Sequence, residues 1–213
     1  MCIRDRAYTL HLTNTGNAAD TFDLSLAGNT WVVNLPVSPV ALAAGASANV
    51  TVNVTIPADA LAGADDAVTV TAASQGDPAQ EADALLTTTA NTVYGLELTP
   101  PTAALSGDPG AVVAYTLHLT NTGNVADTFD LSLAGNTWVV NLPVSPVALA
   151  AGATANVTVN VTIPADALAG ADDAVTVTAA SQGDPAQEAD AVLTTTANAV
   201  DGSRLYPSDA ADA

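Results

Sequence analysis

The sequence predicts an all-β protein built from two tandem β-sandwiches of one kind. Residues 7–93 and 114–200 align without a gap and differ at only four of 87 positions, which indicates two copies of one domain. Within each copy, apolar and polar residues alternate with a period of two, as they do in half-buried strands. Turn residues separate these runs, and no segment of about ten residues or more has a helical period.

The offset between the copies is 107 residues, so each copy has the ordinary size of a domain with one hydrophobic core. We expect one domain at 7–93 and the other at 94–202, with residues 1–6 and 203–213 outside them. The four differences between the copies are Ala18/Val125, Ser47/Thr154, Leu85/Val192 and Thr92/Ala199.

The first copy begins with a strand at 8–13, where Tyr, Leu and Leu alternate with Thr and His. Asn-Thr-Gly-Asn at 14–17 predicts a turn, because these residues tolerate positive φ or turn geometry. A second strand follows at 21–26, and Ala-Gly-Asn at 27–29 turns the chain again. In the next segment, 31–35, the Trp, Val and Leu side chains share one face.

Pro36 and Pro39 restrict the following segment to a sheet edge or an extended connection, because proline cannot donate to a ladder. After a turn at Gly45, residues 49–56 form the clearest predicted strand, with three valines and an isoleucine on one face. A shift of one residue would expose all four, so we expect a firmly set register. Pro57–Gly63 is predicted to make a single helical turn.

The last two strands of the first copy are predicted to begin at Val68 and to cover 82–90. In the second copy, residues 94–98 alternate and predict an opening strand, after which Thr99–Thr102 bends the chain. This opening segment has no counterpart before residue 7, so we expect the first sandwich to lack its opening strand. About seven short strands per copy predict immunoglobulin-like (Ig-like) Greek-key β-sandwiches.

Two motifs occur in both copies. Tyr-Thr-Leu-His-Leu-Thr-Asn-Thr-Gly-Asn lies at 8–17 and 115–124, and Asn-Val-Thr-Val-Asn-Val-Thr-Ile-Pro lies at 49–57 and 156–164. They resemble the NPCBM-associated domain of bacterial α-galactosidase-type proteins, over nearly all of 94–200 and most of 7–93. The resemblance implies an Ig-like fold and a non-catalytic accessory role in secreted or cell-surface proteins. It brings no catalytic residue with it.

The two ends of the chain resemble translated sequencing-adapter sequence, so we expect 1–6 and 203–213 to be assembly scars on an internal fragment of a longer reading frame. Arg4, Arg6 and Arg204, the only Lys or Arg residues, lie in these ends, and so does Cys2.

The composition of the remaining body excludes several classes of function. It keeps 19 of the 22 acidic residues and a net charge of −19, which repels nucleic acids and anionic lipid. Without cysteine it holds no disulfide and no thiolate site. No apolar run reaches the roughly 18 residues of a membrane-spanning helix. We therefore expect no nucleic-acid partner and no membrane insertion.

The two histidines, His11 and His118, occupy one position in the two copies. Each lies on the outer face of a predicted strand, with no second histidine or cysteine in its domain to complete a metal set. We interpret both as solvated strand residues. No serine lies on a Gly-x-Ser-x-Gly turn either, so we expect no catalytic residues and no enzyme activity.

Calcium is the one cofactor that the acidic residues suggest. Calcium needs six to eight oxygen ligands, which acidic loops at domain ends can supply. Solvated acids that keep the surface soluble are the favoured alternative, since no Asp-x-Asp-x-Asp loop is present, and we predict no cofactor otherwise. The candidate ligands are Asp20, Asp23, and Asp65 and Asp66 in a loop after Gly63, with their equivalents Asp127, Asp130, Asp172 and Asp173.

Trp31 and Trp138 are the candidate ligand-binding residues, because an exposed indole can stack on a sugar ring. A core anchor is the alternative that we favour for a lone tryptophan followed by two valines. The Asn-Val-Thr sequences at Asn49, Asn53, Asn156 and Asn160 are explained by strand alternation rather than by glycosylation.

Together these observations predict a structural spacer repeat of a large secreted or cell-surface prokaryotic protein. Its expected partners are neighbouring copies of the same repeat. The alternative is an accessory or adhesin module that binds glycan or a surface protein beside an enzyme domain.

Overall fold

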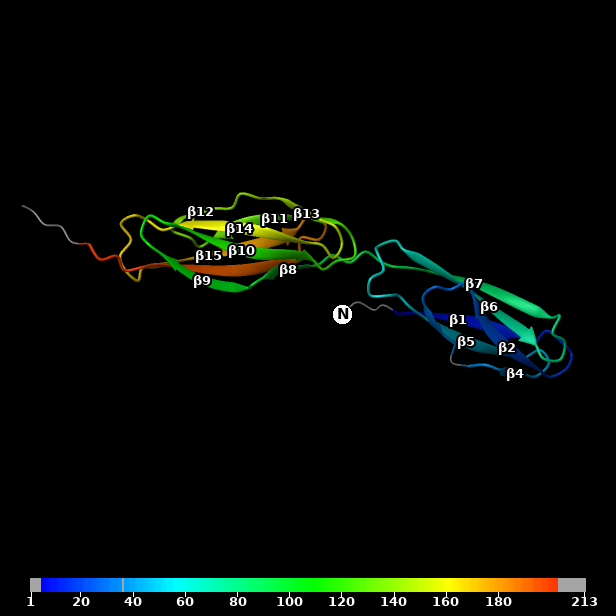
Figure 1. Cartoon of the computed structure of the whole chain (residues 1–213). Coiled ribbons are helices and arrows are strands. Elements are labelled where there is room, and N and C mark those ends of the chain that lie inside the picture. The colour runs from blue at the N-terminus through cyan, green and yellow to red at the C-terminus, as the bar shows by residue number, and fades with distance from the viewer. Residues whose placement is uncertain (1–4, 36, 203–213) are drawn as a thin grey trace, which may run out of the picture. The chain divides into compact units, whose positions relative to one another are not determined.

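The computed structural model describes residues 5–35 and 37–202, which form sixteen β-strands and no helix (Figure 1). The chain divides into two units, residues 1–93 and 94–213, whose described parts are called repeat 1 and repeat 2 below. The all-β prediction is confirmed. No helix that could cross a membrane is found in the described part of the chain.

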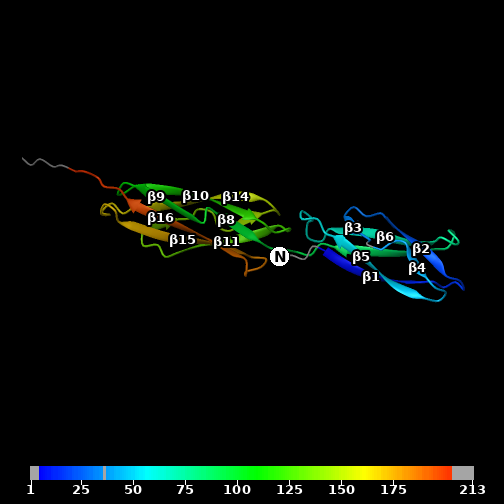
Figure 2. The same ribbon diagram turned by 90° about the horizontal axis from the view of Figure 1, so that it is seen from below.

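Repeat 2 is a sandwich of two sheets, seen from a second direction in Figure 2. One sheet has the strand order β12-β14-β10-β8, and the other has the order β13-β11-β15-β16-β9. The strands are β8 (Leu96–Thr99), β9 (Thr102–Gly107), β10 (Val112–Asn121), β11 (Asp127–Ala134), β12 (Val139–Asn141), β13 (Val147–Leu149), β14 (Thr154–Thr162), β15 (Asp172–Ser181) and β16 (Glu188–Ala197).

Repeat 1 has the same two sheets without counterparts of β8 and β9. Its sheets have the orders β1-β5-β3 and β4-β2-β6-β7, so β1 and β7 are edge strands. The strands are β1 (Asp5–Thr13), β2 (Asp20–Ala27), β3 (Val32–Asn34), β4 (Val40–Leu42), β5 (Ser47–Thr55), β6 (Asp65–Ser74) and β7 (Glu81–Thr89).

The alternation of the sequence sets both the register and the core. β10 pairs with β14 in antiparallel register, and Leu117 lies opposite Val157. Both side chains are fully buried, whereas His118 and Asn156, one position along, are exposed partners on the outer face. The core of repeat 2 therefore consists of the inward-facing positions of the two sheets, with Phe129 among its largest buried side chains.

Some predicted elements differ from the structure. The opening segment of repeat 2 is two strands, because Thr99–Thr102 carries the chain from one sheet to the other. Pro57–Gly63 forms turns rather than a helical turn. Asp5 and Arg6, assigned by sequence to the first end segment, pair within β1. Pro36 and the remaining end residues, 1–4 and 203–213, lie outside the described residues.

Candidate functional site

In repeat 2, the carboxylate of Asp173 holds the turn that leads to Trp138. Asp173 is 7% exposed and accepts hydrogen bonds from the backbone N–H of Thr137 at 2.8 Å and of Trp138 at 3.1 Å. The Thr137 hydroxyl donates to it as well, at 2.6 Å. The side-chain amide of Asn136 donates to the Trp138 carbonyl oxygen at 2.9 Å, so the backbone is fixed on both sides of the tryptophan.

Repeat 1 contains the same arrangement around Asp66. Its carboxylate accepts from Thr30 N–H at 2.8 Å, from the Thr30 hydroxyl at 2.7 Å and from Trp31 N–H at 3.1 Å. Burial raises the pKa of Asp66 and of Asp173, but the hydrogen bonds from the Thr and Trp residues outweigh it. The pKa of each carboxyl therefore lies below its ordinary value.

Replacing Asp173 with alanine is expected to destabilise repeat 2 in a pH-dependent way. Because the folded-state pKa is lowered, the carboxylate stabilises the fold fully above its unfolded value of about 3.9. This stabilisation is lost as the pH falls through the folded-state pKa. We expect D173A to lower the free energy of unfolding by about 2 kcal/mol at neutral pH, and by less near pH 2.

Thermal unfolding followed by circular dichroism at both pH values measures this difference. D172A is the matched control, because Asp172 is the exposed neighbour and its replacement removes the same charge. An equal loss of stability for D173A at both pH values, or equal effects of the two substitutions, would contradict the assignment.

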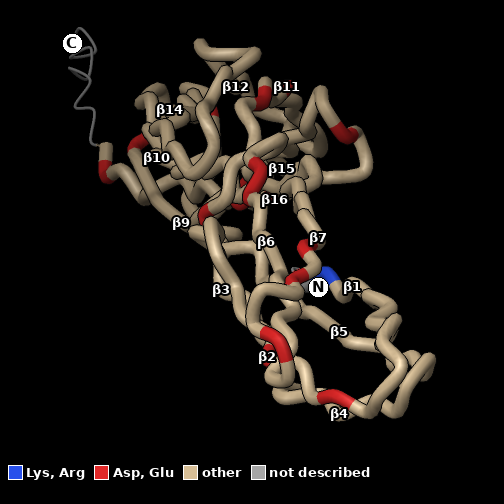
Figure 3. The backbone as a smooth tube through the Cα atoms, turned by 90° about the vertical axis from the view of Figure 1, so that its right-hand side faces the viewer, with Lys and Arg blue, Asp and Glu red and all other residues tan. Residues whose placement is uncertain are grey.

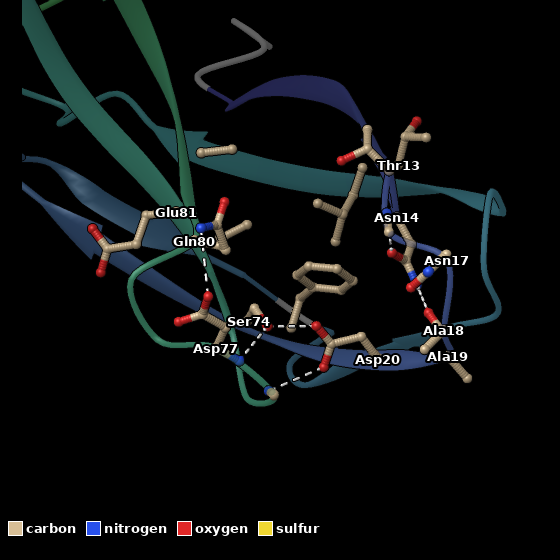
Figure 4. Close-up of a pocket in the computed structure, with 17 residues that line it drawn as sticks. Thr13, Asn14, Asn17, Ala18, Ala19, Asp20, Ser74, Asp77, Gln80 and Glu81 are labelled. Atoms are coloured by element: carbon tan, nitrogen blue, oxygen red, sulfur yellow. Dashed lines mark hydrogen bonds between the residues drawn. The ribbon is translucent and has the colours of Figure 1, made fainter.

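A second carboxylate, that of Asp20, lies near the opposite end of β6 in repeat 1 (Figure 4). It accepts from Thr21 N–H at 2.7 Å, from Gly76 N–H at 3.2 Å and from the Ser74 hydroxyl. Ser74 Oγ in turn accepts from Asp77 N–H at 2.9 Å. These bonds, led by the one from Ser74, lower the pKa of Asp20.

The calcium candidates do not converge on one point. In repeat 1, Asp20 bonds to the last residue of β6 and Asp66 is the second residue of that strand, so strand geometry separates them by about 25 Å. Asp23 is exposed and accepts from Gln75 at 2.9 Å, and Asp65 is also exposed.

The same placement holds in repeat 2 for Asp127, Asp130, Asp172 and Asp173. Among the described residues, no group of three or more His, Cys, Asp or Glu side chains could hold a metal ion. Figure 3 shows the acidic residues as separate short segments along the backbone.

Three of these aspartates are buried, so their interpretation as solvated acids is wrong. They are Asp66, Asp127 and Asp173. Their oxygens accept hydrogen bonds that close turns onto the sheet, because a buried carboxylate is stable only when its lone pairs are satisfied. Asp65 and Asp66 also begin β6 rather than lying in a loop.

The histidines lie where the alternation places them. His11 and His118 are exposed on the outer faces of β1 and β10. The Nδ1 atom of His118 is 2.8 Å from Oδ1 of its cross-strand partner Asn156. Asn49 is likewise exposed, on the outer face of β5. In each repeat, the histidine and the asparagine lie on the outer face of one sheet.

Trp31 and Trp138 are half-buried and pack against the cores of their repeats. Each directly precedes a three-residue edge strand, β3 or β12. The neighbouring Val139 is 71% exposed, so one apolar side chain faces solvent beside each half-covered indole.

Sequence reasoning missed two polar residues that fasten the strands. The Tyr115 hydroxyl donates to the Thr194 carbonyl oxygen at 2.7 Å and so joins the two sheets of repeat 2. Asn121, 1% exposed, donates to the carbonyl oxygens of Val125 and Leu149. Two sequence features could have identified them: a tyrosine at an inward-facing strand position and an asparagine directly before Thr-Gly. A polar group that is buried at such a position needs a hydrogen-bond partner.

Two hollows open along one side of repeat 1. The larger has a volume of about 570 Å³ and is lined by the Asp20 network together with Leu12, Phe22 and Gly76 (Figure 4). The smaller has a volume of about 150 Å³ and is lined by apolar residues of both sheets, including Leu10 and Ala84, together with His11 and Asp83. Both lie beside the edge strands β1 and β7.

A protein-family model described as the Ig-like fold at the C-terminus of FixG, putative oxidoreductase, matches the chain twice, at residues 6–90 and 114–196. The two matches coincide with the two repeats, and the prediction of tandem Ig-like sandwiches is confirmed. The resemblances to the NPCBM-associated domain and, at the two ends, to adapter sequence stay predictions. No curated protein matches the chain.

The solved structures that match this chain share little sequence with it. A PapD-like domain of human CEP192 is 13% identical, with a TM-score of 0.41, over 50% of this chain and 87% of that one. A Porphyromonas gingivalis protein of unknown function is 12% identical, with a TM-score of 0.37, over 90% of this chain and 91% of that one. Escherichia coli α-2-macroglobulin is 15% identical, with a TM-score of 0.34, over 76% of this chain and 10% of that one.

Proposed function

This chain belongs to the family with an Ig-like fold at the C-terminus of FixG, and from that membership we propose that its repeats are non-catalytic structural spacers. Their parent would be a large secreted or cell-surface prokaryotic protein, and their partners would be neighbouring copies of the repeat. In the family description the putative oxidoreductase is FixG, whereas the matched part is an Ig-like domain.

The observation that carries this proposal is the near-identity of two tandem sandwiches. Only four of 87 aligned positions differ, and each repeat has its own core. All units of a spacer have the same role, and the only property that a unit needs for this role is a stable fold. Among the described residues, the buried carboxylates serve that fold, since they accept hydrogen bonds from adjacent turns.

The charge of the chain fits a surface location. A net charge of −19 keeps copies apart by repulsion, although their strands are similar enough to exchange. The resemblance of the two strand motifs to domains of secreted and surface proteins supports the same location.

Adding repeats is expected to lengthen the protein by a constant amount. Proteins with one, two and three tandem copies of residues 94–200 should differ in maximum dimension by about 30 Å per copy, the length of a ten-residue strand. Small-angle X-ray scattering measures this dimension. A maximum dimension that stays constant as copies are added would show that the repeats fold back on one another and would refute the spacer function.

A second candidate function, glycan binding, is favoured by the half-buried Trp138 beside the exposed Val139. Protection of Trp138 fluorescence from acrylamide by one polysaccharide in a panel would support it. If no polysaccharide changes the quenching of Trp138 fluorescence by acrylamide, the spacer function remains the better explanation.

A further inference from the structure

We propose that the outer face of the β12-β14-β10-β8 sheet binds the same face of a second copy of this chain, so that separate chains contact one another through it. The matching sheet of repeat 1, β1-β5-β3, presents the same kind of face. The proposal rests on the spacer function proposed above, and it adds the surface through which neighbouring spacers meet. This surface is called the low-charge face below.

The low-charge face of repeat 2 consists of the outward side chains of four strands. They form cross-strand rows, because β14 pairs with β12 and β10, and β10 also pairs with β8. In order along the sheet, the rows are Val139, Thr162 and Val112; Asn141, Asn160 and Ala114; Thr158 and Thr116; Asn156, His118 and Thr99; and Thr154, Thr120 and Glu97. Among these side chains only Glu97, at the edge of the last row, is acidic.

The outer face of the opposite sheet carries the acids instead. In repeat 2 its exposed carboxylates come from three neighbouring strands and belong to Asp130, Asp172, Glu188 and Asp190. The same positions are acidic and exposed in repeat 1, at Asp23, Asp65, Glu81 and Asp83. By contrast, the outward positions at 7–13 of β1 and at 47–55 of β5 contain no acid.

This division of charge decides which side of a repeat a second copy can approach. Two chains with a net charge of −19 repel each other. The repulsion is smallest when the acidic faces point away from each other, because the energy between like charges falls with distance. Contact through the low-charge face satisfies this condition, whereas contact through the opposite face brings the carboxylates together.

One row of the low-charge face is apolar and exposed. Val139 is 71% exposed and Val112 is 61% exposed, and both are cross-strand neighbours of Thr162. In repeat 1, Val32 is 70% exposed beside Thr55. Covering such side chains removes apolar surface from water, so this row favours contact with another surface.

The other rows are suited to pairing with copies of themselves. An asparagine amide contains both donors and an acceptor, and a threonine hydroxyl both donates and accepts. A two-fold axis parallel to the strands places each row opposite the same row of the second copy. The row of Asn160 then meets an identical amide row, the row of Thr158 meets hydroxyls, and the row of Val139 meets valines. The face is therefore chemically complementary to itself.

The size of the face sets the strength of the contact. β14 has nine residues and β10 has ten, which gives a length of about 30 Å. Four strands at a spacing of about 4.8 Å add a width of about 15–20 Å, so the face covers roughly 500 Å². A standard stable interface needs roughly 800 Å² from each partner. We therefore expect a weak and reversible contact, which forms where many chains are crowded together, as on a surface.

Sedimentation velocity of the full chain tests the contact, with a reducing agent present because the sequence contains Cys2. We expect the mean sedimentation coefficient to rise between about 10 μM and about 1 mM protein, the range that suits a weak interface. The rise should be larger in about 0.5 M than in about 0.05 M sodium chloride, because salt screens the repulsion between acidic chains.

A matched pair of double variants locates the contact. Thr51→Glu with Thr158→Glu puts a carboxylate at the middle of the low-charge face of each repeat. It should weaken association at least about tenfold, since like charges are brought together. Thr69→Glu with Thr176→Glu makes the same change on the outer faces of β6 and β15 in the opposite sheet and should weaken it much less. Thermal unfolding by circular dichroism checks that both variants fold.

Three results would overturn the proposal. They are a chain that stays monomeric at every concentration, equal weakening by the two double variants, and association that disappears at high salt. A monomeric chain that bound a neutral polysaccharide through Thr51 and Thr158 would make a glycan the occupant of the face, and this too would overturn it. None of these results would change the length added per repeat in X-ray scattering, so the spacer function is tested separately.

Discussion

The intact chain is expected to unfold in two separate thermal transitions, with repeat 1 melting before repeat 2. Repeat 1 lacks counterparts of β8 and β9, and its edge strands β1 and β7 have open sides. In repeat 2, Leu98 and Ala103 cover the same core. Burying one leucine contributes about 1.5–3 kcal/mol, and fuller burial of its neighbours adds to this, so we expect a difference of at least about 3 kcal/mol.

The two tryptophans make this difference measurable. W138F leaves Trp31 as the reporter of repeat 1, and W31F leaves Trp138 as the reporter of repeat 2. Fluorescence of W138F should change at the lower temperature. Circular dichroism of each variant is the control, because it must still show both transitions. If the two reporters give the same melting temperature, the lack of counterparts of β8 and β9 does not lower the stability of repeat 1.

Replacing phenylalanine with alanine at equivalent positions is expected to cost very different amounts in the two repeats. Phe129 is 0% exposed in the core of repeat 2, so F129A should lower the free energy of unfolding by about 4 kcal/mol. Phe22 lines the open hollow of repeat 1 and is half-buried, so F22A should cost roughly half as much.

Urea unfolding of the two variants, with the tryptophan reporters in place, measures the two costs. The comparison is internally matched, because strand, register and nearly all neighbours are the same in both repeats. Equal costs would show that the core of repeat 1 is as well covered as that of repeat 2.

Alternation in the sequence predicted the strands well, because one face of every sheet is buried. Val50, Val52 and Val54 are buried as expected, and the exposed Asn49 and Thr51 lie on either side of Val50. Self-similarity predicted the two domains without any structural knowledge. Alternation and self-similarity are both regular patterns within one sequence, which is why they could be identified in a single chain.

The roles of the polar residues could not be predicted in the same way. Asp173 bonds to residues 35 and 36 positions away, and Asp127 bonds to a serine 54 positions away. Such distant pairs leave no periodic pattern, so a buried aspartate looks like a solvated one. The second strand of the opening segment, β9, was missed as well, because its sequence has three apolar residues in a row and does not alternate.

The parallel pairing of β9 with β16 also decides how repeat 2 would carry tension. β9 lies near the start of the repeat and β16 at its end, and six residue pairs from Thr102/Val192 to Gly107/Ala197 join them side by side. A pull on the two ends of the repeat would load these hydrogen bonds together in shear, instead of opening them one after another. A repeat without this ladder would give way at a lower force, so the seating of one short strand would set the mechanical strength of the unit.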